Sequence, residues 1–228
     1  MAQTWHDLLF AHWSVSAAHV ATLIPPMLTL DTFDGHAWVG VIPFHMTGVR
    51  LRGLPPIPGT SALPEINLRT YVTHGGKPGV YFFSLDAGSA LAVAVARRWF
   101  HLPYFRAAFE VKVAAGGVEY HHRRRHRGAP DARFEATYHV VGDVLPFQAG
   151  SLERWLTERY CLYAVAGPRV FRAEIHHGPW PLQRADADLR IDTLPDAHGV
   201  SIPPAPPLLH FSRRQDVRVW APERVDLG

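Results

Sequence analysis

The chain of 228 residues contains little cysteine and little lysine. Its single cysteine, Cys161, excludes an internal disulfide and cysteine-rich metal motifs. Lys77 and Lys112 are the only lysines, so a mechanism in which lysine forms a Schiff base has very few candidates. The basic residues are therefore nearly all arginines. Arginine binds carboxylates and phosphates through paired hydrogen bonds, although a GC-rich genome produces the same bias.

Long hydrophobic runs are also absent. The most apolar stretches, Gly79–Leu85 and Leu91–Ala96, are far shorter than the roughly 20 residues that cross a bilayer. Met1–Asp7 lacks the basic and apolar regions of a signal peptide. The hydrophobic content of 47% is nevertheless enough for a sizeable core. These features predict a cytoplasmic protein with no membrane partner.

Metal and phosphate motifs are missing as well. The neighbouring pairs His121–His122 and His176–His177 point to opposite faces of a strand, and the fifteen histidines show no His-x-His or His-Glu-x-x-His spacing. Gly75–Gly79 contains a proline and is typical of a hairpin turn, not of a phosphate-binding loop. We therefore predict no metal or other cofactor, while a metal site assembled from distant histidines stays open.

One basic run, His121–Arg127, raises the question of nucleic acid binding. Phosphate contacts need such side chains on one surface, but strand alternation divides this run between two faces. Few aromatic residues accompany it, and the formal net charge of the chain is only +3. We predict a solvated edge hairpin and no nucleic acid partner.

The remaining pattern is mainly that of strands separated by glycine- and proline-containing turns. Proline-rich loops are expected at Leu54–Gly59 and Ile202–Pro207, and neither marks a change in composition. We predict one domain over residues 1–228, of the α+β class with mainly antiparallel strands. The expected strands are Ala37–Phe44, Ile66–Thr73, Gly79–Leu85, Ala107–Val113, Val118–Arg127, Phe134–Val141, Val170–His177 and Asp216–Trp220, with the fourth to sixth forming a meander.

Three helices are expected, each beginning near a serine. Their ranges are Ser16–Ile24, Ser89–Phe100 and Ser151–Ala164. Ser151 is the N-cap of the third helix, and either Asp86 or Ser89 can cap the second.

Polar side chains alternate along the strand that begins near Glu65. Glu65, Asn67 and Arg69 share one face, with Tyr71 following, because successive strand residues point to opposite sides. A carboxylate, an amide and a guanidinium in line can bind a polar ligand and move a proton. An exposed strand face with a cross-strand ion pair has the same pattern, so both interpretations stay open.

The segment Ala96–Phe105 resembles the part of acetoacetate decarboxylases that carries the paired catalytic lysines. In those enzymes two lysines follow a proline, and the first forms a Schiff base with the keto acid. Here Tyr104 and Phe105 follow Pro103. Neither side chain can form an iminium ion, so the decarboxylase reaction is not expected at this position.

Further blocks resemble the uncharacterised YqjF-like family, which is related to the acetoacetate decarboxylases. They extend over nearly the whole chain and comprise Trp5–Trp13, Asn67–Val72, Gly79–Asp86, Pro179–Gln183 and Leu209–Ser212. Pro64–Asn67 is similar to the decarboxylase segment that places a glutamate in the active-site cavity. The resemblance implies a partly closed β-barrel with a few peripheral helices and a central cavity, but no reaction.

The same resemblance implies roles for individual residues. Glu65 would act as a base, Tyr104 would donate a proton or hydrogen bond to a carbonyl oxygen, and Arg69 or Arg97 would hold a carboxylate, with Asn67 beside them. Alternatively, Tyr104 is a core aromatic and Arg97 pairs with Glu65 or Asp86.

Two functions remain open at this point. The first is a protein that binds a small organic acid or carbonyl compound in its cavity and acts as an acid/base enzyme without a lysine adduct. The second is a non-catalytic ligand sensor or interaction module. An exposed apolar rim of Trp5, Phe10 and Trp13 would favour a homo-oligomer, although such residues more often pack onto their own domain.

Overall fold

All strands in the described part of the chain belong to one continuous sheet. The computed structural model describes residues 1–50 and 62–225, so the predicted loop Leu54–Gly59 lies outside the described residues. The strands are β1 Ala2–Val15, β2 Thr29–Leu30, β3 Ala37–Arg50, β4 Ala62–His74, β5 Lys77–Ala87, β6 Tyr104–Ala114, β7 Gly117–Arg124, β8 Arg133–Val141, β9 Cys161–Ala166, β10 Arg169–His176, β11 Gln183–Asp192, β12 Leu208–Val219 and β13 Glu223–Arg224.

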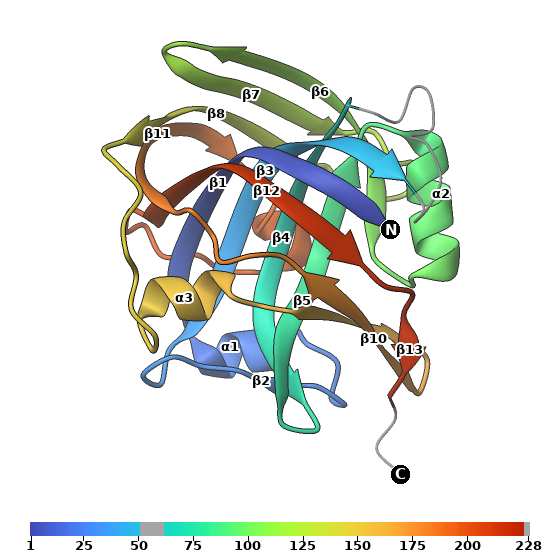
Figure 1. Cartoon of the computed structure of the whole chain (residues 1–228). Helices are drawn as coiled ribbons and strands as arrows, with labels where there is room; N and C mark the ends of the chain where they lie inside the picture. Colours follow the sequence, from blue (N-terminus) through green and yellow to red (C-terminus); the bar gives the residue numbers. More distant parts are fainter. Residues whose placement is uncertain (51–61, 226–228) are drawn as a thin grey trace.

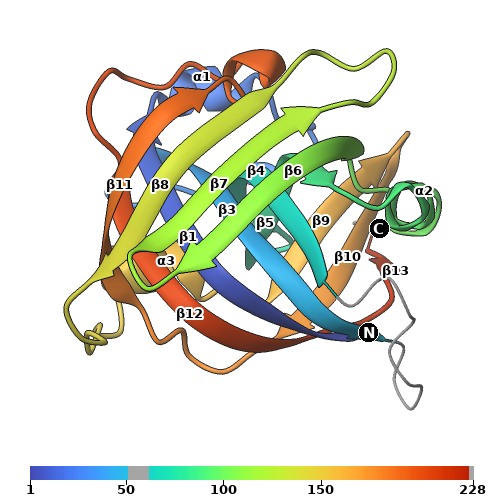
Figure 2. The same cartoon turned by 90° about the horizontal axis from the view of Figure 1, so that it is seen from above.

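The strands close into two rings that share a wall (Figure 1). The large ring runs through β5, β6, β7, β8, β11, β12, β1, β3 and β4, and it closes where β4 pairs with β5. The small ring uses β9 and β10 to connect β5 with β12. The shared wall therefore consists of β12, β1, β3, β4 and β5. Seen from above, β11, β8, β7 and β6 lie side by side and arch over β1 and β3 (Figure 2).

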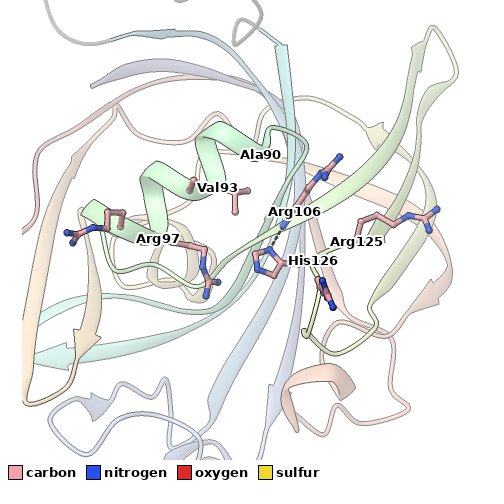
Figure 3. Close-up of a pocket in the computed structure, with 9 residues that line it drawn as sticks. Ala90, Val93, Arg97, Arg106, Arg125 and His126 are labelled. Atoms are coloured by element: carbon pink, nitrogen blue, oxygen red, sulfur yellow. Dashed lines mark hydrogen bonds between the residues drawn. The ribbon is translucent and has the colours of Figure 1, made fainter.

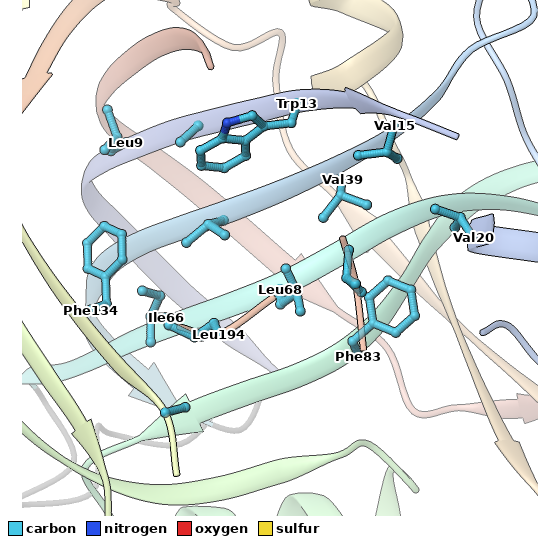
Figure 4. Close-up of a cluster of buried hydrophobic side chains, with 14 of the residues drawn as sticks. Leu9, Trp13, Val15, Val20, Val39, Ile66, Leu68, Phe83, Phe134 and Leu194 are labelled. Atoms are coloured by element: carbon cyan, nitrogen blue, oxygen red, sulfur yellow. The ribbon is translucent and has the colours of Figure 1, made fainter. Parts of the chain in front are cut away.

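Both faces of the shared wall are covered. On the large-ring side, Ile66 and Leu68 of β4 pack in a cluster with Leu9 and Phe134 (Figure 4). Tyr120 belongs to the same cluster. On the small-ring side, Tyr71 packs in a cluster with residues of β9, β10 and β12. A strand buried on both faces can carry polar residues only where they find partners or a function.

The antiparallel α+β class predicted from the sequence is confirmed. The hairpin turn at Gly75–Gly76 joins β4 to β5, and β6, β7 and β8 form the expected meander. Among the strand pairings of the described residues, only those of β5 with β6 and with β9 are parallel. The prediction of an edge hairpin for His121–Arg127 is wrong, because β7 lies between β6 and β8.

In the part of the chain that the structure describes, three short helices accompany the sheet: α1 Ala17–Ala21, α2 Ala90–Trp99 and α3 Leu152–Thr157, with a 3₁₀ turn at Asp196–His198. The hydroxyls of Ser16, Ser89 and Ser151 each accept a hydrogen bond from a backbone N–H of the first turn. These caps explain where the helices begin. Among the described residues, no helix is long and apolar enough to cross a membrane.

The predicted helix Ser151–Ala164 is wrong in its second half. α3 ends at Thr157, and Cys161 opens β9 instead of lying in a helix. Cys161, Leu162, Tyr163 and Ala164 are all buried, because β9 is inserted between β5 and β10. A continuous apolar run of this kind fits a buried strand as well as a buried helix, and periodicity cannot separate the two.

The N-terminal segment forms part of the core. Phe10 and Trp13 lie on β1 and are buried, at 0% and 5% exposure, and Trp5 is half-buried. These aromatics therefore do not form an exposed rim. A homo-oligomer stays a prediction without this support.

Candidate functional site

The first pair of predicted site residues meets inside the small ring. Glu65 lies on β4 opposite Ala87 of β5, and Tyr104 opens β6 opposite Leu85 of the same strand. This arrangement brings the Tyr104 hydroxyl to the Glu65 carboxyl, where it donates a hydrogen bond of 2.8 Å to Oε2. Glu65 is 3% exposed.

The environment of this pair favours the protonated forms. Burial raises the pKa of Glu65 to about 8, although the hydrogen bond from Tyr104 acts in the opposite direction and the charge of Asp86 adds to the increase. Burial and the neighbouring Glu65 charge together hold the pKa of Tyr104 well above 10. The pair therefore combines a carboxyl that exchanges its proton near neutral pH with a phenol that stays a donor.

A tyrosine on the other face of the wall fixes the backbone at this point. The Tyr120 hydroxyl of β7 lies 2.8 Å from the Glu65 carbonyl oxygen and 3.2 Å from that of Phe44. Tyr120 is completely buried. It links the large ring to the strand that carries the candidate carboxyl, and sequence reasoning did not identify it.

Arg69 lies on the same face of β4 as Glu65, as predicted. It is 9% exposed, and its Nη2 donates to the Tyr71 hydroxyl at 3.4 Å and to the Leu156 carbonyl at 3.2 Å. Its guanidinium also lies over the Phe10 ring, 5.6 Å from the centroid. No carboxylate pairs with it within residues 1–50 and 62–225. A buried cation usually has an anionic partner, so Arg69 is suited to an anionic ligand.

Asn67 occupies the position between Glu65 and Arg69. It is 5% exposed, and its Oδ1 has no hydrogen-bond partner in the described part of the chain. The Nε of Arg69 likewise has none. Unpartnered buried polar atoms on one strand face are unusual in a structural core, because each carries a desolvation cost. The interpretation of this face as an exposed strand with an ion pair is wrong, since all three residues are buried.

A buried histidine on the neighbouring part of the sheet contacts Tyr71, the next residue on this face of β4. His12 of β1 approaches the Tyr71 hydroxyl at 2.7 Å through Nε2, and that hydroxyl donates to the Leu156 carbonyl at 2.8 Å. Gly40 makes room for the imidazole, because a Cβ there would lie 2.8 Å from His12 Cδ2. Burial, with the charges of Arg69 and His210, lowers the pKa of His12 well below 6.5. No local motif marks His12, whose partner is distant in sequence.

Arg97 does not join the interior residues. It lies exposed on α2, donates to the Tyr104 backbone carbonyl at 2.8 Å, and sits 5.6 Å from the Phe105 ring centroid. The alternative in which Arg97 pairs with Glu65 or Asp86 is therefore wrong, and Arg97 does not lie with Asn67 and Arg69. The short helix places its last turn against the outside of β6, so Arg97 contacts the backbone of Tyr104 while the phenol points inward.

A second buried charge cluster lies on the opposite face of β5. Arg124 donates to both oxygens of Asp86, at 2.8 and 2.7 Å, and His122 lies 2.9 Å from the same carboxylate. Burial acts to raise the pKa of Asp86, but the hydrogen bonds from Arg124 and His122 outweigh it, and the net shift is downward. Asp86 is thus neither the cap of α2 nor the partner of Arg97, and its cluster stabilises the wall.

The two lysines lie outside this interior. Lys77 pairs with Glu174 at 2.7 Å, and Lys112 pairs with Glu110 at 3.0 Å. Both are substantially exposed, at 40% and 63% of the side chain. Among the described residues, no group of three or more histidine, cysteine or acidic side chains is arranged to hold a metal ion.

Comparison with known proteins assigns the family. The sequence matches DUF2071, described as an uncharacterized conserved protein, over residues 2–216. The chain belongs to the DUF2071 family. It is 46% identical over 220 residues to the uncharacterized protein YqjF of Bacillus subtilis (strain 168), covering 96% of this chain and 90% of YqjF. The resemblance to the YqjF-like family is thereby confirmed.

Solved structures with the same fold are acetoacetate decarboxylase-like. An acetoacetate decarboxylase-like enzyme from Sphingomonas wittichii RW1 matches with a TM-score of 0.67 at 13% identity, covering 100% of this DUF2071 chain and 93% of that enzyme. An acetoacetate decarboxylase matches with a TM-score of 0.66 at 13% identity, and the match covers 99% of this chain and 89% of the decarboxylase. The enduracididine biosynthesis enzyme MppR complexed with pyruvate matches with a TM-score of 0.66 at 14% identity, and the match covers 98% of this chain and 89% of MppR. At these identities the likeness shows the fold alone.

Proposed function

We propose that the small-ring face of β4 binds a small organic acid that carries a carbonyl group, and that Glu65 and Tyr104 act on it as an acid/base pair. The observation that carries this proposal is the buried Glu65 carboxyl, 2.8 Å from the Tyr104 hydroxyl, with its pKa raised to about 8. Perturbed carboxyls with a specific partner are concentrated at functional sites.

Arg69 is the proposed carboxylate-binding residue. Its guanidinium is buried without an acidic partner among the described residues, and a ligand carboxylate would provide one. Positions 65 and 69 lie about 13 Å apart along the strand, at roughly 3.3 Å per residue. Asn67 lies between the two positions on the same strand face.

The proposed reaction is proton transfer at the carbon next to the carbonyl group. Ionised Glu65 takes the proton from that carbon, the electron pair moves onto the carbonyl oxygen, and Tyr104 donates a hydrogen bond to the oxygen as it becomes negative. Return of the proton from Glu65 regenerates the carbonyl compound. Because only ionised Glu65 acts as a base, the rate should rise with pH through about 8.

A covalent lysine intermediate has no part in this proposal. Tyr104 and Phe105 follow Pro103, and Lys77 and Lys112 form ion pairs at substantially exposed positions. Support for the ligand class comes from MppR, which has been solved with pyruvate and with the condensation product of pyruvate and imidazole 4-carboxaldehyde.

The test is exchange of the methyl protons of pyruvate in deuterated water, followed by proton NMR. We expect the wild type to accelerate exchange, and Glu65→Gln to lose about a hundredfold or more of the acceleration, as removal of a general base does. Tyr104→Phe should reduce it less. Lys77→Arg serves as the matched control and should leave it unchanged.

Two outcomes separate this proposal from its alternatives. Saturable pyruvate binding with no exchange would indicate the non-catalytic ligand sensor. Borohydride trapping of pyruvate on Lys77 or Lys112 would contradict the non-covalent mechanism. The acid/base function is favoured over the sensor because no arginine, lysine or histidine forms an ion pair with Glu65 in the described part of the chain.

A further inference from the structure

A groove rich in arginine lies on the outer surface, between α2 and the adjoining ends of β6 and β7. Its volume is about 640 Å³. Figure 3 shows α2 along one side and the segment after β7 along the other. The charged and imidazole side chains that line it are Arg97, Arg98, Arg106, Arg125, His126 and Arg127, and no acidic residue within 1–50 and 62–225 lines it. This groove lies outside the interior face of β4, so its occupancy is independent of the function proposed above.

Among the described residues, the arginines of the groove form no ion pair with an acidic side chain, whereas some other surface arginines do. Arg172 pairs with Glu174 at 2.7 Å, and Arg214 pairs with Asp216 at 3.2 Å. In the part of the chain that the structure describes, no such pair forms for any arginine of the groove. Like charges gathered in one groove repel one another, and a bound anion would remove that repulsion.

Several groups are held in place before any ligand binds. The Arg97 guanidinium is fixed by the Tyr104 carbonyl at 2.8 Å and by the Phe105 ring. His126 Nδ1 accepts the backbone N–H of Arg106 at 3.1 Å, so the neutral ring carries its proton on Nε2 as a donor. The backbone N–H of Arg125 donates to the Arg106 carbonyl at 2.8 Å, which holds the segment after β7 against β6. Pre-ordered donors reduce the entropy lost on binding.

We propose that this groove binds a small phosphate-bearing molecule, of the organic phosphate or diphosphate class. Phosphate oxygens suit the planar fork of arginine, and several guanidiniums can share the charges of one diphosphate. The volume lies within the range of about 300–1,000 Å³ typical of small-molecule sites. Ala90 and Ala94, both exposed on α2, supply a short apolar surface for the organic part.

The test is calorimetric titration of inorganic pyrophosphate into the intact protein. We expect saturable one-to-one binding that weakens as salt is added, since the contacts are ionic. The double variant Arg106→Gln, Arg125→Gln should weaken it by about a hundredfold, at about tenfold for each lost charged contact. Both side chains are exposed, and thermal unfolding would verify that the variant is folded. Arg214→Gln, which removes an arginine of a surface ion pair, should bind as the wild type does.

Three results would overturn the proposal. The first is a lack of specific binding, seen either as a pyrophosphate titration that never saturates or as equal affinity of the double variant and the wild type. The second is citrate binding as tightly as pyrophosphate, which would make the groove a carboxylate site. The third is a short single-stranded RNA that displaces pyrophosphate and binds more tightly, which would identify a nucleic acid surface.

Discussion

At the scale of single residues, strand alternation predicted which side chains share a face but not what they meet. The positions of Glu65, Asn67 and Arg69 follow from a period of two. Tyr104 was found only through the resemblance to a lysine-bearing segment. His12 and Tyr120 could not be found from the sequence, because their hydrogen-bond partners are 59 and 55 residues away. Arg97 was misplaced because sequence order does not say which side of a strand a helix packs against.

The raised pKa of Glu65 predicts how stability changes with pH. The folded state holds this proton up to about pH 8, whereas the unfolded chain releases it near 4.5, so wild-type stability falls as pH rises between these values. Glu65→Gln removes this loss. The variant should gain stability relative to the wild type across that window, by roughly 5 kcal/mol at most. Urea unfolding at a series of pH values measures the difference.

A surface carboxyl provides the control for this experiment. The hydrogen bond from His121, with the charge of Lys112, lowers the pKa of Glu119, so Glu119→Gln should show no gain of stability with rising pH. Burial also raises the pKa of Asp192 to about 7. Because Asp192 is present in the wild type and in both variants, its effect on stability cancels when they are compared. If the free energies of unfolding of the wild type and Glu65→Gln change equally with pH, then Glu65 does not hold its proton in the folded state as proposed.

At the scale of elements, local signals located helix starts better than helix ends. Ser89 and Ser151 cap their helices as expected, because a cap is a local interaction. The end of α3 depends on β9, which takes its conformation from β5 and β10. Residues 161–166 are apolar enough for either state, so tertiary pairing decides.

The insertion of β9 beside β5 predicts a strong effect at Gly79. A Cβ at this position would lie 2.7 Å from Tyr163 Cε2 and 2.9 Å from the Cys161 carbonyl oxygen. Gly79→Ala should therefore reduce the free energy of unfolding by about 1–3 kcal/mol, the usual cost of overpacking. Gly116→Ala, which meets no atom within 4 Å, should change it by less than about 0.5 kcal/mol. If Gly79→Ala is as stable as the wild type, the close approach of β5 and β9 is wrong.

At the scale of the whole molecule, the two rings explain why the candidate site is buried. Side chains of the large ring cover one face of the shared wall, and β9 and β10 cover the other. Antiparallel hairpins were predictable from turns, but ring closure was not, because no strand was predicted at β1, at β11 or over most of β12. The one-domain organisation and cytoplasmic location stay predictions. Double coverage of β4 is what removes water from Glu65 and raises its pKa.

The most direct test of this account is an infrared pH titration of the Glu65 carboxyl, assigned by difference against Glu65→Gln. We expect a protonated carboxyl band at pH 7 that disappears with a midpoint near pH 8. Because the Tyr104 hydrogen bond lowers the pKa of Glu65, Tyr104→Phe should move the midpoint upward. A Glu65 carboxyl that is already ionised at pH 6 would contradict a buried acid/base group in the small ring.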